Sequence, residues 1–228
     1  MWIINAIRSG NMTQLVIGLF VRLFIIFAIL PIHEFAHGWM AKKLGDNTAR
    51  YQGRLTMNPL AHVDPMGALF IIFFGFGWAR PVPINPYNFK NRKRDTALTA
   101  LAGPVSNVLV AVIGAFLYYA VFLLFPIQLT QTIVYVAYFF NTFISINIGL
   151  AVFNLLPIPP LDGSRIFSAI LPDKWVFKMA QYEQYIFIGL FLLLFTGVLN
   201  PVTNFFEQYV TQGVLWLASL PFRLFGLL

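Results

Sequence analysis

Residues 23–37 read LFIIFAILPIHEFAH, an apolar run that ends in two histidines and a glutamate. The run lies inside a longer apolar segment, from about residue 15 to about residue 40, and roughly 20 apolar residues are enough for a helix to cross a bilayer. On such a helix His33 and His37 lie one turn apart and face the same way. Ionisable groups at this depth cost free energy, so the pattern indicates a functional site within a membrane protein.

The composition of the whole chain is that of a membrane protein. Of its 228 residues, 59% are hydrophobic and 10% are charged, and the mean hydropathy is +0.75. A soluble domain carries about 25% charged residues, and a water-soluble fold could not bury the apolar surface of this chain. The net charge of +7 comes from basic residues between the apolar runs, so we expect a lipid bilayer and no nucleic acid as partner. Cysteine is absent, which excludes disulfides and cysteine-based catalysis.

Further apolar runs predict the remaining helices. We expect an all-α membrane protein, a polytopic transmembrane helix bundle formed as a single domain over residues 1–228. Its spans are predicted at about 15–40, 97–125, 132–156 and 185–198. Residues 205–228 mix polar and large apolar side chains, which fits either a further span or an interfacial helix. Residues 50–57 alternate weakly, which favours a short β-hairpin after the first span.

The HExxH pattern formed by His33, Glu34 and His37 is typical of a zinc centre. Two imidazoles one helical turn apart can bind one ion, and Glu34 can act as general base toward the attacking water. A catalytic zinc takes three protein ligands. From the residues alone the third remains open between His62 and the carboxylates Asp46, Asp64, Asp95, Asp162, Asp173, Glu183 and Glu207. Asp162 is distinctive, because it follows a long apolar run and a proline-rich stretch.

Three segments resemble the signatures of the site-2 protease family, and they occur in the family's order. They are HEFAH at 33–37, LAGPVSN at 101–107 and NLLPIPPLDG at 154–163. The similarity covers about residues 20–170. Without an inserted PDZ or CBS domain, the chain looks like the compact bacterial and archaeal members of that family.

The resemblance implies an intramembrane zinc metalloprotease, which hydrolyses peptide bonds within or near transmembrane segments of membrane protein substrates in regulated intramembrane proteolysis. It implies Asp162 as the third zinc ligand, and Asn154 with Pro157 and Pro159 as residues that hold the substrate backbone. Asn107 is a further candidate for supporting the zinc site. His62 departs from the family's ligand set, and we interpret it as a loop or near-site residue.

The zinc ligands also constrain the topology. All three must reach one depth in the membrane, so the chain must cross an even number of times between them. The spans at 97–125 and 132–156 supply two crossings, so residues 66–78 should dip in and return. The basic residues of the long loops then share one side, which the positive-inside rule makes cytoplasmic, and the uncharged loop at 126–131 lies opposite. We therefore expect a multi-pass protein of the cell membrane whose active site faces the cytoplasm.

Two other classes of protein fit parts of this pattern. A metal or proton transporter could use the same intramembrane cluster, but transporters show repeated halves with paired broken helices, and this sequence shows no internal repeat. A catalytically inactive membrane binding protein would have no need of Glu34, which is intact.

Overall fold

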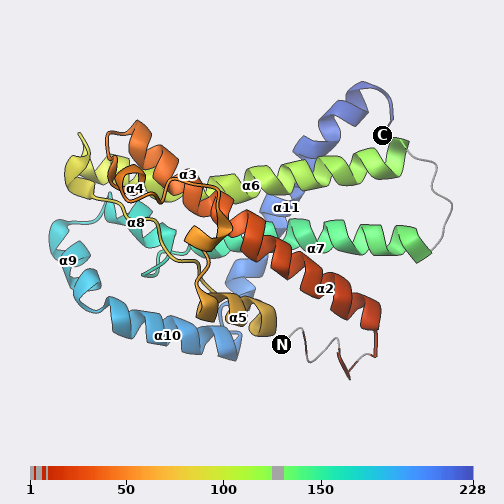
Figure 1. Ribbon diagram of the computed structural model, residues 1–228, viewed down its shortest axis with the longest axis horizontal. Coiled ribbons are helices and arrows are strands. Elements are labelled where there is room, and N and C mark those ends of the chain that lie inside the picture. The colour runs from red at the N-terminus through yellow and green to blue at the C-terminus, as the bar shows by residue number, and fades with distance from the viewer. Residues whose placement is uncertain (1–2, 4–6, 9, 125–130, 228) are drawn as a thin grey trace.

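The computed structural model describes the chain except for residues 1–2, 4–6, 9, 125–130 and 228, so most of the predicted loop at 126–131 lies outside the described residues. The described residues are helical or irregular and form no β-strand, which confirms the prediction of an all-α chain (Figure 1). The elements in chain order are α2 (Met12–Phe24), η1 (Ile25–Ile29), α3 (Leu30–Lys43), α4 (Thr48–Tyr51), η2 (Pro59–Ala61), α5 (Pro65–Phe74), η3 (Pro86–Asn88), α6 (Arg92–Leu124), α7 (Gln131–Asn154), α8 (Asp162–Ser168), α9 (Asp173–Gln181), α10 (Glu183–Thr196) and α11 (Asn200–Leu224).

Three continuous helices are long and apolar enough to cross a membrane. The first comprises α2, η1 and α3 over Met12–Lys43, and the other two are α6 and α7. Taken together, α9 and α10 are also long and apolar enough, but they are bent by 70° at a short break. The described chain therefore has three or four candidate spans, as expected of a multi-pass membrane protein. The helix α11, which covers most of residues 205–228, is not among these candidates.

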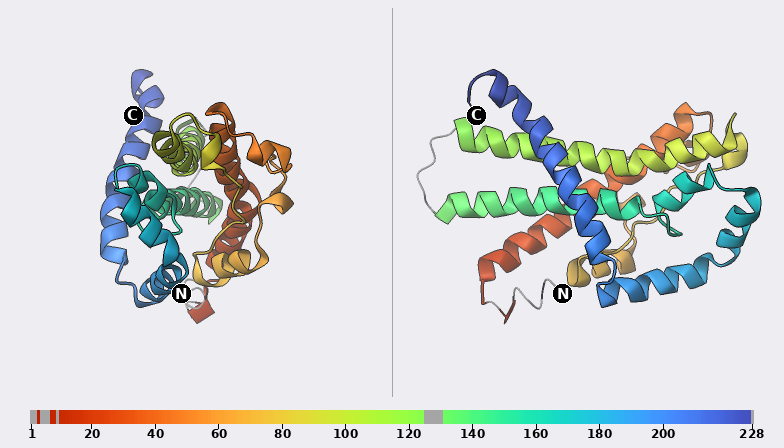
Figure 2. Two further views of the ribbon diagram at one scale, coloured as in Figure 1. Left: turned by 90° about the vertical axis from the view of Figure 1, so that its left-hand side faces the viewer. Right: turned by 180° about the vertical axis from the view of Figure 1, so that it is seen from behind.

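The centre of the bundle is an antiparallel pair of long helices, α6 and α7, which lie side by side (Figures 1 and 2). Gly114 allows their close approach, because a Cβ at this position would lie 2.8 Å from the ring of Phe143. The first span packs against both helices, with α3 on α6 and α2 on α7, and α11 crosses them obliquely on the other side (Figure 2). This arrangement returns the end of α7 to the part of α6 that contacts α3.

The first span contains one turn of π-helix, η1, directly ahead of the two histidines. A π turn inserts a residue into an α-helix and is often found at functional sites. Ile25, Ile26 and Ile29 of this turn are all buried in the core. Pro31 follows at the start of α3, within the continuous span, where it removes one N–H from the backbone hydrogen bonds after the π turn.

The two ends of the segment that contains α5, His62 and Arg80, lie side by side. The N–H of Arg80 donates to the carbonyl oxygen of His62 at 2.8 Å. Between these residues, Gly75 ends α5 in the left-handed region with a φ of 89°. The chain then returns so close to α5 that a Cβ on Gly67 would overlap the backbone of Trp78. The segment therefore turns back without crossing the bundle, which is the path that the even-crossing argument requires.

The β-hairpin predicted at residues 50–57 is wrong. The short helix α4 occupies its beginning, and the N–H groups of Gln52 and Arg54 donate to the carbonyls of Thr48 and Ala49. These local bonds satisfy the backbone, and weak alternation over so few residues carries little information about a strand. Residues 80–85 are neither helix nor strand, and Asn85 is in the extended region. The prolines at 81, 83 and 86 favour extended backbone for the residue before each of them, so we call residues 80–85 the extended segment.

Aromatic rings join α10 to the α5 segment. On α10 the rings recur every fourth residue and so share one helical face. The contacts across the seam, given as distances between ring centroids, are Trp78–Phe187 at 5.9 Å, Phe70–Phe191 at 5.1 Å and Phe74–Phe195 at 5.4 Å. These ring contacts hold both α5 and the chain that returns after it beside α10.

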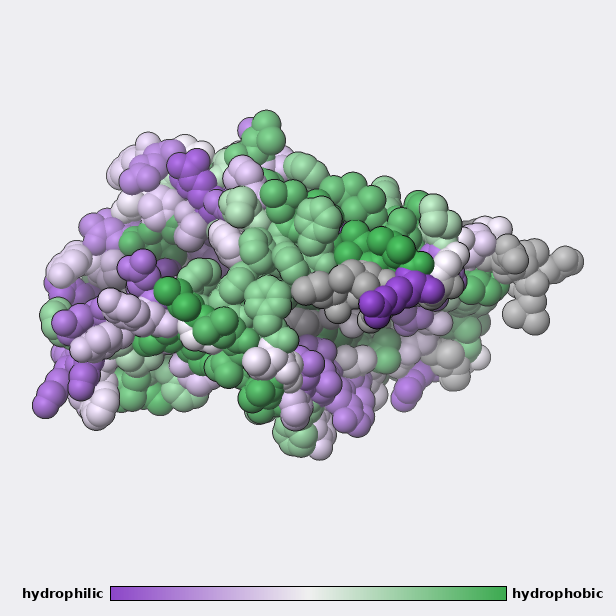
Figure 3. Space-filling model, turned by 90° about the horizontal axis from the view of Figure 1, so that it is seen from below, coloured by the Kyte–Doolittle hydropathy of each residue, from purple (hydrophilic) through white to green (hydrophobic). Residues whose placement is uncertain are grey.

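Polar and apolar residues separate along the bundle. In Figure 3, hydrophilic residues gather at the end of the molecule that carries α4 and α9, and hydrophobic residues cover the middle. Exposed apolar side chains such as Leu109 and Ile113 of α6, which are 58% and 59% exposed, fit a surface that faces lipid.

Candidate metal centre

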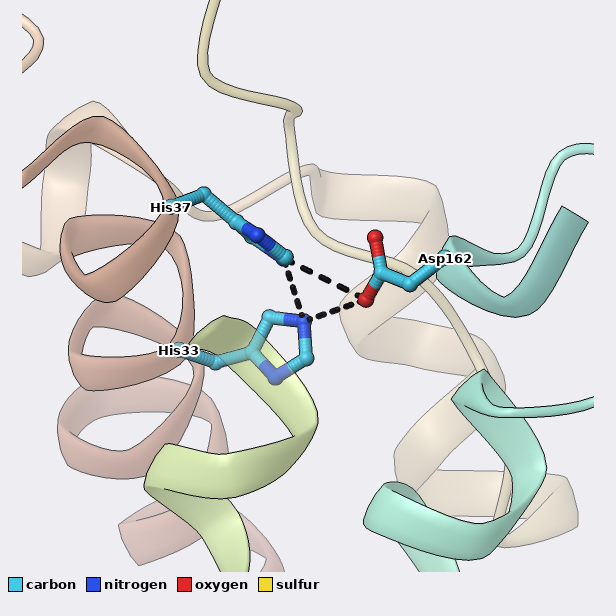
Figure 4. Close-up of side chains that lie close together, drawn as sticks. All are labelled: His33, His37 and Asp162. Carbon is cyan, nitrogen blue, oxygen red and sulfur yellow. Dashed lines mark hydrogen bonds and ion pairs between the residues drawn. The ribbon is translucent and has the colours of Figure 1, made fainter. Parts of the chain in front are cut away.

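Three side chains converge between α3 and the start of α8 (Figure 4). Nε2 of His33 lies 3.1 Å from Nε2 of His37, and Oδ2 of Asp162 lies 3.3 Å and 3.2 Å from these two nitrogens. Both histidines are buried. Among the described residues, this is the one group of three or more side chains able to hold a metal ion.

The hydrogen bond made by Nδ1 of each imidazole determines which ring nitrogen carries the proton. Nδ1 of His33 lies 3.1 Å from Oδ1 of Asn107, and Nδ1 of His37 lies 2.7 Å from the carbonyl oxygen of Thr99. Both partners are acceptors, so each Nδ1 carries the proton and donates it. Each Nε2 therefore presents a lone pair to the centre, which is the tautomer that a metal ligand needs.

These three atoms fit a zinc ion. Oδ2 of Asp162 is buried and accepts no directed hydrogen bond, in spite of the two short approaches to the histidines. Three lone pairs thus meet with no proton between them, which is unfavourable unless a cation is present. Zinc ligands lie about 2.0–2.2 Å from the ion, so the corners of their tetrahedron are about 3.3–3.6 Å apart. The observed separations of 3.1–3.3 Å are close to this spacing.

Gly103 makes room for both imidazoles. A Cβ at this position would overlap Nε2 of His37 and would lie 2.6 Å from Cε1 of His33. A glycine within a membrane helix often allows close helix packing, but what Gly103 packs against is the metal centre. Pro104 follows, and it removes one backbone hydrogen bond from this part of α6.

Asp162 reaches the centre through a compact turn after α7. Residues 155–161 leave the helical path, and Asp162 begins α8. Gly163 is required in this turn, because a Cβ there would overlap the carbonyl oxygens of Leu155 and Leu156. The LDG sequence thus combines a ligand with the residue that lets the turn fold back.

Glu34 lies beside the ligands in a cavity of about 260 Å³. It is 9% exposed, and its Oε2 accepts a hydrogen bond of 2.9 Å from the N–H of Val82. Its other carboxylate oxygen has no hydrogen-bond partner among the described residues. A carboxylate in this position can take a proton from a water held at the metal.

The residues predicted to hold substrate lie at different distances from this cavity. Asn154 is in its wall, and its Nδ2 donates to the carbonyl of Leu150 at 2.9 Å, whereas no hydrogen bond of its Oδ1 is found among the described residues. Pro157 and Pro159 are not in the wall, whereas Pro160 is. Which proline faces the cavity depends on the turn, which the spacing of the prolines does not reveal.

The structure places Asn107 at the metal centre and His62 away from it. Asn107 contacts His33 as a supporting residue would. His62 is buried in the loop before α5, where its Nε2 lies 2.8 Å from the carbonyl of Thr56, and it is not part of the metal group.

Sequence reasoning missed two backbone groups, the carbonyl of Thr99 and the N–H of Val82. No side-chain pattern could identify them, because every residue has a carbonyl and nearly every residue an N–H.

The fold and the site define a class of protein, a membrane-embedded metallohydrolase with an HExxH helix. Comparison with known proteins is more specific. The model of Peptidase family M50 matches residues 21–196. YwhC of Bacillus subtilis is 44% identical over 178 residues, which cover 76% of this chain and 81% of YwhC. Rip2 of Mycolicibacterium smegmatis is 29% identical over 176 residues, which cover 75% of this chain and 65% of Rip2. The names of both relatives describe predicted zinc metalloproteases.

The chain therefore belongs to Peptidase family M50, the site-2 protease family, and is a zinc metalloprotease of that family. No solved structure matches it.

Proposed function

We propose that this metalloprotease cuts peptide bonds within or next to transmembrane segments of other membrane proteins, as in regulated intramembrane proteolysis. The observation that supports this is the position of the metal centre. His33 and His37 belong to a helix that is long and apolar enough to span a membrane, and they are only 6% and 5% exposed. A substrate that is itself in the bilayer can approach such a site from the side.

The side chains around the centre have separate tasks. Zinc, when bound, supplies a Lewis acid that polarises the peptide carbonyl and makes water acidic enough to react. Glu34 accepts the proton of the attacking water and passes it to the leaving amine. Asn107 and the carbonyl of Thr99 hold the two imidazoles in the tautomer that binds zinc.

The extended segment at residues 80–85 is a place where an unwound substrate can pair. A transmembrane helix hides its peptide bonds, and once unwound it must replace its hydrogen bonds, since lipid offers none. Pro81 and Pro83 have no N–H, whereas the N–H of Val82 donates to Glu34. In an extended chain the N–H of Ile84 lies on the same edge as that of Val82. The N–H of Ile84 has no partner among the described residues. We propose that the substrate joins this edge by β-augmentation and that Asn154 holds it from the other side.

The active site faces the cytoplasm in this proposal. Basic residues are concentrated in the loops around the site, on the polar end of the bundle, and the positive-inside rule assigns such loops to the cytoplasm. Single cysteines at Asn91 and Lys174 should both react with an impermeant thiol reagent only from the cytoplasmic side. Labelling from outside, or from opposite sides, would contradict this orientation.

The direct experiment is co-expression with candidate single-span proteins. Wild-type protein should convert one or more of them to shorter fragments, and Glu34→Gln should abolish cleavage while retaining zinc, because the amide cannot accept the proton. Glu207→Gln makes the same chemical change on α11, away from the cavity, and serves as the matched control. Cleavage that survives Glu34→Gln would overturn the proposal.

A further inference from the structure

A second cavity lies behind the extended segment. It measures about 650 Å³ and is bounded by residues 80–86, the first turns of α6 and one residue of α8. Pro81, Val82, Ile84 and Arg165 line both this cavity and the catalytic one. The two spaces are therefore neighbours that share one wall, and a chain bound along the extended segment passes close to both.

Two exposed arginines line the second cavity without an anionic partner among the described residues. Arg80 and Arg165 both line it, and neither side chain makes an ion pair or hydrogen bond to any described residue. No acidic residue is among the described residues of its wall. Two other cations at this end of the bundle do form ion pairs, Lys93 with Asp173 and Arg94 with Asp95, each at 2.8 Å.

A third arginine increases the positive charge. Nη2 of Arg54 donates to the carbonyl oxygen of Arg80 at 2.8 Å, which holds a further guanidinium near the same residue. Burial lowers the pKa of Arg54 and repulsion from the charge of Arg80 lowers it further, while the charge of Glu34 in the neighbouring catalytic cavity opposes both effects. Like charges that are held together in this way repel one another, and an anion bound between them would relieve the repulsion.

We propose that this second cavity is a carboxylate-binding subsite, in which Arg80 and Arg165 receive an aspartate or glutamate side chain of the substrate. The subsite rests on the proposed function, because its ligand is part of the chain to be cut. Arginine suits this task, since its planar fork forms two parallel hydrogen bonds with a carboxylate.

The position of the acidic residue follows from α8. Arg165 lies three residues after Asp162, so the two side chains share a helical face and are about 4.5 Å apart along the axis. An extended chain advances about 3.3 Å per residue. The recognised carboxylate should therefore belong to a residue about one or two positions from the cleaved bond.

The test measures binding apart from cleavage. Full-length zinc-loaded Glu34→Gln protein in lipid nanodiscs is titrated into a fluorescent single-span peptide that contains a Gly-Pro helix break. Glu, Gln or Lys is placed in turn at each of the six positions after the break, and Kd is measured by anisotropy. Arg80→Gln with Arg165→Gln is compared with a matched double variant, Lys42→Gln with Arg50→Gln, which removes two exposed charges outside the cavity.

At one or more positions the Glu peptide should bind about tenfold more tightly than the Gln peptide, with Lys weaker still. This ratio should fall to about one in Arg80→Gln with Arg165→Gln and persist in the matched control. Each single substitution, checked for full zinc content, should reduce the ratio in part. Equal binding of Glu and Gln at every position, or a preference that survives the loss of both arginines, would overturn the subsite. Failure of the proposed function is a different result, in which the preference is present but protein with Glu34 intact does not cut the preferred peptide.

Discussion

An alanine at position 103 tests the metal centre without altering a metal ligand. A Cβ on Gly103 would lie 2.6 Å from Cε1 of His33, where an ordinary contact needs at least 3.4 Å, so the ring must retreat by about 0.8 Å. Metal sites tolerate deviations of about 0.2 Å in ligand distance. We therefore expect Gly103→Ala to lower zinc affinity about 100-fold or more, at or beyond the upper end of losses from supporting residues.

Gly114→Ala is the matched control for this prediction. It lies on the same helix, but its Cβ would meet the ring of Phe143 on α7 and no metal ligand. It should destabilise the bundle by about 1–3 kcal/mol through overpacking and leave zinc affinity unchanged. Zinc competition against a fluorescent chelator, combined with melting temperature, separates the two effects. Wild-type zinc affinity in Gly103→Ala, or equal loss of affinity in both variants, would refute the reasoning.

Three further predictions concern polar residues, two of them at the site and one, Asp46, in the loop after α3. Asn107→Ala removes the acceptor for His33 and should weaken zinc binding about 10- to 100-fold in the same competition assay. Asn154→Ala should lower cleavage of a reporter while zinc content and melting temperature are retained, and a joint loss of all three would assign it a structural role. Burial alone would raise the pKa of Asp46, but hydrogen bonds from neighbouring side chains and from the N–H of Asn85 hold it below its usual range. Its stabilising contribution is therefore complete above about pH 4 and lost as the pH falls through the lowered pKa, so Asp46→Asn should flatten the acid side of the melting-temperature profile.

The helices could be predicted because membrane spans are encoded locally, in the length of apolar runs. Their ends could not, because a helix starts at a cap and not where hydrophobicity begins. The span predicted from residue 97 begins at Arg92, after Asn91, whose Oδ1 accepts a hydrogen bond from the N–H of Arg94. The wrong hairpin has a related cause, since a strand depends on a distant partner that local alternation does not reveal.

In the candidate site, too, local features could be predicted from sequence and long-range contacts could not. His33 and His37 share one helix, so their spacing alone brings them together. The long-range links from His33 to Asn107 and to Asp162 depend on how α6 and α8 pack. The sequence indicated Asp162 as a ligand through resemblance to a family, and Asn107 as a candidate for support. No motif indicated Val82, which lies in the wall between the two cavities and donates to Glu34, because its position depends on the path of a loop.

Zinc content per chain tests the central claim most directly. Purified wild-type protein and His62→Ala should each hold about one zinc, measured by mass spectrometry against protein concentration. Asp162→Ala should lose most of it, because one of three converging ligand atoms is removed. A full complement of zinc in Asp162→Ala, or an empty site in folded His62→Ala, would contradict the assignment of the metal centre to His33, His37 and Asp162.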